Sequence, residues 1–326
     1  MSKELLVDPL TREKSGESKL IFVIGKGGVG KTTISILIAH VLSESRKVLL
    51  VSLDQAMHLL EYLSIEKPMK KYTIKENFEA MQVDVRELIK RESRDYVSLL
   101  KSVMPGLSIV SADNVVESLK HNPGFEEEVY LRFISNLFSE QDYDFIVIDT
   151  PPTGVTYRIL KLPRLYLFWF DELIKLRKRI INLRYTIART MGKEIEPSDP
   201  VLMRLHKLKD EYSSLLNHLR DPSRTSYVSV LTPEPLPLFE TKNTIKFLED
   251  MKTKISLIII NRLLSKESAE SIGVLDTQKS VLAELKELAC KRNVSIISIM
   301  HHTVPPRKLD EALKLLELLE KITCTS

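Results

Sequence analysis

Short apolar runs rich in β-branched residues recur along this chain of 326 residues, and longer helical patterns separate them. Within each run the apolar residues are continuous rather than alternating, which is typical of strands that are buried on both faces of a sheet. Strands of this kind need crossover helices, so the sequence predicts an α/β fold with a mostly parallel sheet flanked by helices. The expected strands are 20–24, 48–53, 145–148, 227–231, 255–260 and 294–300, with two shorter candidates at 78–83 and 107–110.

The segment from Arg164 to Arg224 lacks this strand pattern. It is long, amphipathic and basic, and strands resume after it. We therefore expect an inserted α-helical lobe rather than a separate domain. The expected boundaries are 1–163 and 225–326 for the α/β domain and 164–224 for the helical insertion. The tail, RKLDEALKLLELLEKI, has the pattern of a further helix.

Charge and hydropathy exclude several classes of protein. The formal net charge is +4 and no Lys/Arg run dominates, so a nucleic-acid partner is not expected. The first residues are polar and mixed in charge, unlike a secretory leader. No apolar run approaches the roughly 18 residues that cross a bilayer. We expect a cytoplasmic protein.

The stretch GKGGVGKTT, Gly25 to Thr33, lies between an expected strand and an expected helix. This context is the one in which a G-x-x-x-x-G-K-[ST] sequence forms a phosphate-binding loop. Glycines let the backbone curl and aim its N–H groups at phosphate oxygens, and the following helix adds its positive end. Lys31 would pair with the β/γ phosphates, and the Thr32 hydroxyl would bind Mg²⁺. The expected nucleotide-binding residues are Gly25, Lys26, Gly27, Gly28, Val29, Gly30, Lys31, Thr32 and Thr33.

Two aspartates follow buried strands. Asp54 ends KVLLVSLD and Asp149 ends DFIVID, so both fall at the sheet edge that carries the phosphate loop. We predict that Asp149 acts on Mg²⁺, together with Thr32, and that Asp54 orients the attacking water. The alternative for either aspartate is a helix cap.

Lys26 is a second lysine in the loop. The pattern GKGGxGKT resembles the deviant phosphate loop of a dimeric ATPase class, in which the early lysine reaches the nucleotide of the partner subunit. The resemblance implies a homodimer in which Lys26, with Lys31, places positive charge on the transferred phosphoryl group. The alternative is a lysine that is merely solvated.

Further stretches resemble one family of such ATPases, which drives arsenite efflux and guides tail-anchored membrane proteins. The similar stretches are NPGFEEEV (122–129), DTPPTGVTYRILKLP (149–163), LTPEPLPLFETK (231–242) and IIINRL (258–263). The resemblance implies hydrolysis of ATP with Mg²⁺ and places Glu234 and Asn261 at the nucleotide, Asn261 at the adenine. It also implies a hydrophobic client helix or protein partner and a transient membrane receptor.

Some positions depart from the family. The D-P-A-H of the family is Asp54-Gln55-Ala56-Met57 here, with His58 one place late, and Val155 replaces a histidine after T-G. The CxxC pair of the membrane-targeting members is missing, and a shared tetrahedral zinc site needs two ligands from each subunit, so no zinc is expected. Two scattered cysteines and a single phosphate loop also disfavour arsenite transport.

The insertion carries an apolar stripe at helical spacing opposite a row of Lys and Arg. By resemblance this stripe is a groove for a client transmembrane helix. The alternative is that it packs on another helix of the same chain. The basic face suggests contact with phospholipid or with ribosomal RNA. The expected groove residues are Leu165, Phe168, Trp169, Leu173, Leu176 and Ile180.

Three hypotheses for function follow. The first is an ATP-hydrolysing homodimeric switch that closes on ATP and targets tail-anchored proteins. The second is a positioning ATPase of the MinD/ParA kind, which shares the two-lysine loop. The third is a nucleotide-switched scaffold that hydrolyses ATP very slowly.

Overall fold

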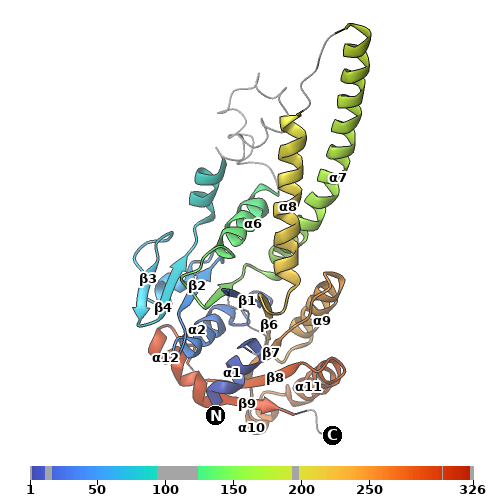
Figure 1. Ribbon diagram of the computed structural model, residues 1–326. Coiled ribbons are helices and arrows are strands. Elements are labelled where there is room, and N and C mark those ends of the chain that lie inside the picture. Colours follow the sequence, from blue (N-terminus) through green and yellow to red (C-terminus); the bar gives the residue numbers. More distant parts are fainter. Residues whose placement is uncertain (1, 12–16, 94–123, 193–197, 303, 324–326) are drawn as a thin grey trace. The chain divides into compact units, whose positions relative to one another are not determined.

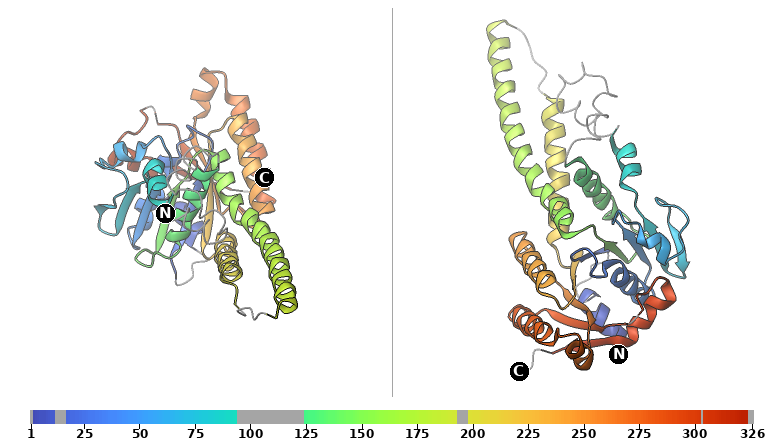
Figure 2. Two further views of the ribbon diagram at one scale, coloured as in Figure 1. Left: turned by 90° about the horizontal axis from the view of Figure 1, so that it is seen from above. Right: turned by 180° about the vertical axis from the view of Figure 1, so that it is seen from behind.

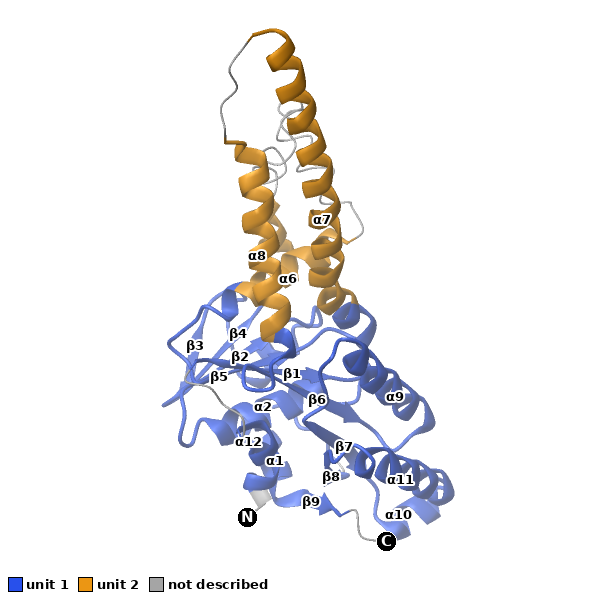
Figure 3. Cartoon of the chain, turned by 45° about the vertical axis from the view of Figure 1, so that its right-hand side comes forward, with its two compact units in different colours: residues 1–84, 136–157, 219–326 blue, residues 85–135, 158–218 orange. Residues whose placement is uncertain are grey.

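The computed structural model describes residues 2–11, 17–93, 124–192, 198–302 and 304–323 (Figure 1). The chain forms two compact units, which Figure 3 colours separately. The first comprises residues 1–84, 136–157 and 219–326, and the second comprises 85–135 and 158–218. The second unit thus takes in 85–135 in addition to most of the insertion expected at 164–224.

The first unit is built on a nine-stranded sheet with the order β3-β4-β2-β5-β1-β6-β7-β8-β9. Neighbours from β4 to β8 pair in parallel, whereas β3 and β9 pair antiparallel at the two edges. The mostly parallel α/β sheet expected from the sequence is therefore confirmed. The strands are β1 (Lys19–Ile24), β2 (Val48–Ser52), β3 (Tyr72–Lys75), β4 (Phe78–Gln82), β5 (Phe145–Asp149), β6 (Thr225–Leu231), β7 (Leu257–Leu263), β8 (Ser295–Met300) and β9 (Leu319–Ile322).

The central strands are buried along their whole length, as their continuous apolar runs predicted. Their register brings functional side chains to one edge of the sheet. Asp149, the last residue of β5, lies opposite Val23 of β1 on one side and Ser52 of β2 on the other. The carboxyl ends of the central strands thus meet beside the loop that follows β1.

Helices pack against this sheet, and one core cluster joins α1, α2, α12 and η2 to it. Two other helices, α9 and α11, pack on each other, and Figure 2 shows them side by side. The helices of this unit are α1 (Ser2–Thr11), α2 (Lys31–Leu42), α3 (His58–Tyr62), α9 (Pro235–Asp250), α10 (Lys266–Ser271), α11 (Leu275–Cys290), α12 (Leu309–Leu313) and the 3-10 helix η2 (Lys314–Leu318).

The sequence predictions for the tail and for residues 107–110 have different outcomes. The helix expected for the whole tail is wrong, because the helical part ends at Leu318 and β9 follows. Pairing of β9 with the outer edge of β8 supplies backbone hydrogen bonds that override the local helical preference. The strand candidate at 107–110 lies outside the described residues.

The described part of the second unit is helical. Residues 85–93 are helical, and α7 and α8 confirm the helical pattern of the insertion. Ile174 of α7 packs with Val201 and Leu205 of α8, and Arg177 forms a two-pronged ion pair with Asp199 at 3.0 and 2.8 Å. The longer helices are α6 (Phe125–Leu137), α7 (Thr153–Thr190), whose first five residues belong to the first unit, and α8 (Pro200–Arg220).

Candidate functional site

The glycine-rich loop joins β1 to α2, and the fold demands its last glycine. Gly30 is the residue before α2 and has a φ of 96°, in the left-handed region that favours glycine. A Cβ at this position would also collide with the side-chain amide of Asn261. Asn261, which is far from the loop in sequence, therefore limits which residue can occupy position 30.

Asn261, near the end of β7, is 6% exposed and fastens the loop. Its Nδ2 donates to the carbonyl oxygen of Val29 at 2.8 Å, and its Oδ1 accepts from the backbone N–H of Arg262 at 3.0 Å. Arg262 has a φ of 60°, so the chain turns sharply at this point. Both ends of the amide are thus engaged within the protein, and a contact with adenine stays a prediction.

Thr32, Ser52 and Asp149 form one buried hydrogen-bonded cluster. The Thr32 hydroxyl donates to Asp149 Oδ2 at 2.7 Å, and the Ser52 hydroxyl donates to the same oxygen at 3.0 Å. Asp149 is fully buried, and its Oδ1 has no hydrogen-bond partner among the described residues. Ser52 was not predicted, although its place two residues before Asp54 at a strand end was a usable indication.

Burial raises the pKa of the Asp149 carboxyl to about 6. Hydrogen bonds from Thr32 and Ser52 and the positive charge of Lys31 oppose this shift, and the charge of Asp54 adds to it. A carboxyl at the end of a buried strand loses its hydration, so its charged form needs a cation or more donors. A nearby cation would therefore stabilise the charged form of the Asp149 carboxyl.

Asp54 lies in the segment between β2 and α3 and is less buried. Its Oδ1 accepts from the N–H of Ala56 at 3.1 Å, and its carbonyl accepts from Nε2 of Gln82 at 2.9 Å. Met57, just before α3, has a φ of 52°, a left-handed conformation that is strained for a residue with a side chain. The segment is thus held by its own turn and by Gln82, at the end of β4.

These elements enclose a cavity of about 220 Å³. The cavity brings the phosphate loop and Asp54 together, as the sequence predicted for the sheet edge. It also includes three side chains that sequence analysis did not assign to the site. His58 belongs to this lining although it stands one place later than in the resembled family. The lining residues are Gly28, Gly30, Lys31, Thr32, Thr33, Asp54, His58, Tyr62 and Arg262.

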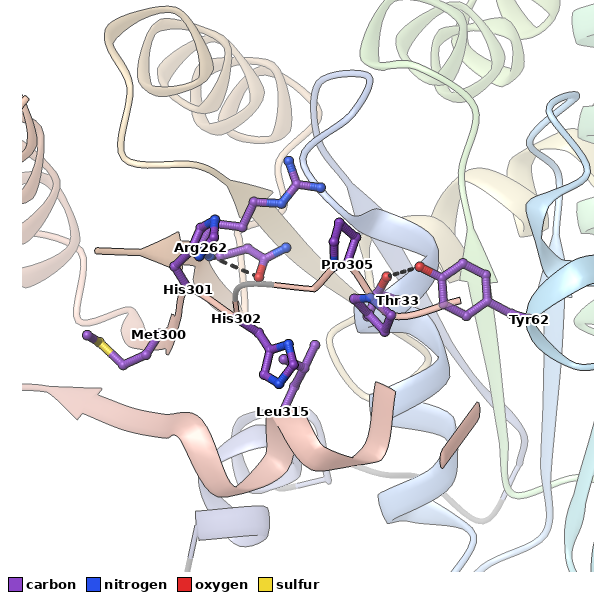
Figure 4. A pocket seen from close by; sticks show the side chains of 10 residues that line it. Thr33, Tyr62, Arg262, Met300, His301, His302, Pro305 and Leu315 are labelled. Atoms are coloured by element: carbon purple, nitrogen blue, oxygen red, sulfur yellow. Dashed lines mark hydrogen bonds between the residues drawn. The ribbon is translucent and has the colours of Figure 1, made fainter. Parts of the chain in front are cut away.

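A neighbouring cavity of about 220 Å³ shares Thr33, Tyr62 and Arg262 with the first (Figure 4). The Tyr62 hydroxyl lies 3.1 Å from the Thr33 hydroxyl, so the first turn of α2 is tied to α3 where the cavities meet. Beyond this point the lining becomes apolar or imidazole-bearing. It comprises Met300, His301, His302, Pro305, Pro306 and Leu315, with Asn261 beside the loop.

Six of the predicted nucleotide and metal residues line neither cavity, namely Gly25, Lys26, Gly27, Val29, Asp149 and Glu234. Lys26 is half-buried, and its carbonyl accepts from the Lys31 ammonium at 3.5 Å. Glu234 is exposed and precedes α9 without capping it through its side chain. Neither residue lines the two cavities, so their roles at a nucleotide stay predictions. The six expected groove residues all lie in α7, in the second unit.

The model of one protein family, described as anion-transporting ATPase, matches residues 18–303 of this chain. The chain belongs to this family. The match runs from the start of β1 to beyond β8 and so covers the phosphate loop, both aspartates and the helical segments between them. It agrees with the family resemblance carried by the sequence motifs.

Relatives of this chain align with between 78 and 93% of its length. "Putative arsenical pump-driving ATPase 2" of Aquifex aeolicus is 29% identical over 92% of this chain and 99% of its own length. "ATPase ASNA1 homolog 2" of Paramecium tetraurelia is 28% identical over 93% and 94%, and "ATPase GET3A" of Arabidopsis thaliana is 34% identical over 78% and 69%. Among the helices of the described residues, none combines the length and hydropathy that a bilayer crossing requires.

Proposed function

We propose that this chain hydrolyses ATP with Mg²⁺ as a homodimeric switch, and that its helical unit binds the hydrophobic transmembrane segments of tail-anchored proteins. The observation that carries the enzymatic part is the buried cluster of Thr32, Ser52 and Asp149 beneath the glycine-rich loop. Membership of an ATPase family supports the same conclusion. The client is proposed from the family resemblance and from the exposed apolar face of α7.

The residues present fit a magnesium ion. Hydroxyl and carboxylate oxygens are the ligands that Mg²⁺ prefers, usually with several waters retained. Among the described residues Oδ1 of Asp149 has no hydrogen-bond partner, and both this and the raised pKa of the carboxyl are consistent with a nearby cation or bound water. Thr32 and Asp149 would hold the ion, which neutralises charge on the phosphate oxygens of the nucleotide.

The chain's own residues supply the remaining chemistry. Loop N–H groups and the positive end of α2 would bind the phosphates, and Lys31 would place its ammonium on the β/γ oxygens. Asp54 lines the same cavity and is only half-buried, so it would orient the water that attacks the γ-phosphate. Lys26 would add charge from the partner subunit, as the resemblance implies.

The adjoining cavity suits the nucleoside. The cavities meet at Thr33, Tyr62 and Arg262, next to the last residues of the phosphate loop. The apolar wall formed by Pro305 and Leu315 suits a flat base, because ligand pockets are mainly apolar with a few placed polar groups. We therefore assign the phosphates to the first cavity and the base to the second.

The apolar face of α7 supports a helical client. At about 100° per residue, Leu165, Trp169, Leu173, Leu176 and Ile180 fall within about 80° of one another. The exposed members of the groove set have between 36 and 62% of their surface accessible. The stripe extends about 22 Å, a large part of the ~30 Å of a transmembrane helix.

The test is to co-express the chain with a tagged single-helix tail-anchored protein and to purify the soluble fraction. We expect a soluble complex that ATP releases and that the double variant Leu173→Asp, Leu176→Asp no longer forms. The matched control, Asn182→Asp with Thr186→Asp, adds two charges to another face of the same helix and should keep the complex. Equal capture by both variants would remove the groove from the proposal.

A different outcome of this test distinguishes ATP hydrolysis from client binding. If the substrate aggregates while the chain still hydrolyses ATP and dimerises on nucleotide, the targeting role is wrong. The positioning hypothesis would then be examined by co-sedimentation with DNA or vesicles in the presence of ATP. A chain that barely turns over alone, and is accelerated by a protein partner, would favour the scaffold hypothesis.

A further inference from the structure

The last turns of α7 combine cations with exposed apolar side chains. Between residues 174 and 192 the sequence has six Lys and Arg and no Asp or Glu. From 182 to 191 every residue except Ala188 is exposed. Leu183, Ile187 and Met191 have 64, 57 and 61% of their surface accessible. A contiguous exposed surface of this kind predicts an external partner.

The charge of this segment is only partly balanced within the protein. Arg177 is paired with Asp199, and Lys175 is paired with Glu172 in the preceding turn. In the part of the chain that the structure describes, the other four cations have no acid within ion-pair distance. These are Lys178, Arg179, Arg184 and Arg189, and all four are exposed.

The order of the side chains around the helix is that of an interfacial helix. At about 100° per residue, Leu176, Leu183, Ile187 and Met191 lie within about 80° of one another. Arg179 falls on one flank of this stripe and Arg184 on the other. Long cationic side chains on both flanks can reach outward to phosphate groups while the apolar stripe lies in the acyl boundary.

We propose that residues 182–191 of α7, together with Arg179, dock on a membrane surface that is rich in anionic lipid. Charge complementarity selects the partner, because Arg179 and Arg184, which flank the apolar stripe and have no acid within ion-pair distance among the described residues, would face an anionic headgroup layer. The exposed Leu183, Ile187 and Met191 favour lipid over RNA, since RNA offers phosphates but no apolar layer to cover them.

Apart from Arg179 and the shared Leu176, this docking surface lies beyond the last residue of the client groove, Ile180, on the same face of α7. It also contains none of the residues assigned to ATP hydrolysis. The inference therefore goes beyond the proposed function and can fail while ATP turnover and client capture persist. Conversely, docking can be measured on the chain without any client present.

The test is flotation of the full chain with vesicles of phosphatidylcholine alone or mixed with phosphatidylglycerol, at low salt. We expect binding only to the anionic vesicles and its loss at high salt. The double variant Arg179→Gln, Arg184→Gln should bind about 30-fold more weakly, since each cation near an anionic surface contributes roughly fivefold. The control, Lys266→Gln with Lys279→Gln, loses the same charge from exposed positions in α10 and α11 and should bind as the wild type does.

Two more variants keep the test decisive. Arg179→Lys with Arg184→Lys preserves the charge and should preserve binding, whereas Ile187→Ser preserves every charge and should weaken binding several-fold. ATP turnover is expected to stay at the wild-type level in all of them. The proposal is overturned if the wild type ignores lipid charge, if the Gln and control variants bind alike, or if the chain binds RNA but not vesicles.

Discussion

The phosphate-loop edge of the sheet and the distal part of α7 differ in which side chains they bury and which they expose. At the sheet edge, polar groups are buried and bonded to one another, as in the Thr32–Asp149–Ser52 cluster. In α7 after Ile180, Leu183, Ile187 and Met191 are exposed, and among the described residues neither Arg184 nor Arg189 has an acid within ion-pair distance. On our proposals, the first region binds a small ligand at a preformed site, whereas the second gains contacts only when a large partner covers it.

The largest effect is expected for a substitution of Asp54, at the phosphate-loop edge of the sheet. Asp54→Asn keeps the shape of the side chain and its turn with Ala56 but removes the charge that we propose orients water. We expect turnover of ATP to fall roughly 10²–10³-fold while nucleotide binding persists, so that an ATP-bound dimer accumulates. Single-turnover hydrolysis and light scattering measure the two effects. Hydrolysis at the wild-type rate would contradict the role of Asp54.

The next effect concerns Asp149 and pH. Its folded pKa of about 6 lies above the ordinary value of 3.8, so the folded state binds more protons between these values. The contribution of Asp149 to the stability of the nucleotide-free chain should therefore be largest below about pH 4 and fall as pH rises through 6. The full difference is about 3 kcal/mol.

Urea unfolding followed by circular dichroism at pH 5 and pH 7 measures this dependence. Asp149→Asn removes the titrating group and should flatten that part of the profile. Binding of Mg²⁺ with ATP should show the reverse trend and weaken below about pH 6, because the ion needs the charged carboxylate. The same slope in wild type and variant would show that another group titrates.

Two isoleucines of α7 allow buried and exposed apolar side chains to be compared within a single helix. Ile174 is 6% exposed and packs against α8, whereas Ile187 is 57% exposed. Ile174→Ala should destabilise the helical unit by about 2 kcal/mol, and Ile187→Ala by less than about 0.5 kcal/mol. The only tryptophan of the chain, Trp169, lies in this unit and reports its unfolding by fluorescence. Equal effects would mean that both positions contribute alike to packing.

The smallest effect is expected at the junction of the two cavities. Tyr62→Phe keeps the aromatic ring and removes the hydroxyl that meets Thr33. We expect about 1 kcal/mol of lost ATP affinity, close to fivefold, because one neutral hydrogen bond near the ligand is lost. Thr33→Val and the double variant complete a mutant cycle. Additive losses would show that the two side chains act independently.

The parallel sheet and the phosphate loop were predictable because their patterns are local. Continuous apolar runs mark buried strands, and the loop needs glycines at fixed spacing. The edge strands were not predictable in the same way, since β9 depends on the free edge of β8 rather than on its own residues. The leucine-rich tail therefore suggested a longer helix than the chain forms.

The site was predictable where a residue ends a strand and not where it comes from a turn. Asp54 and Asp149 follow apolar runs, so topology alone brings them to the loop. Tyr62 and Arg262 reach the cavities through left-handed turns at Met57 and at Arg262 itself, which no local pattern marks. Glu234 and Lys26 were assigned by resemblance, and their assigned roles need a bound nucleotide or a second subunit to be tested.

The contact between Gly30 and Asn261 also has a consequence for how such sequences can change over time. A side chain at position 30 meets the Asn261 amide, and a longer side chain at position 261 meets the loop. A substitution at either position therefore alters which residues the other can accept, although 230 residues lie between them. The glycine-rich loop and the end of β7 must accordingly diversify as one unit.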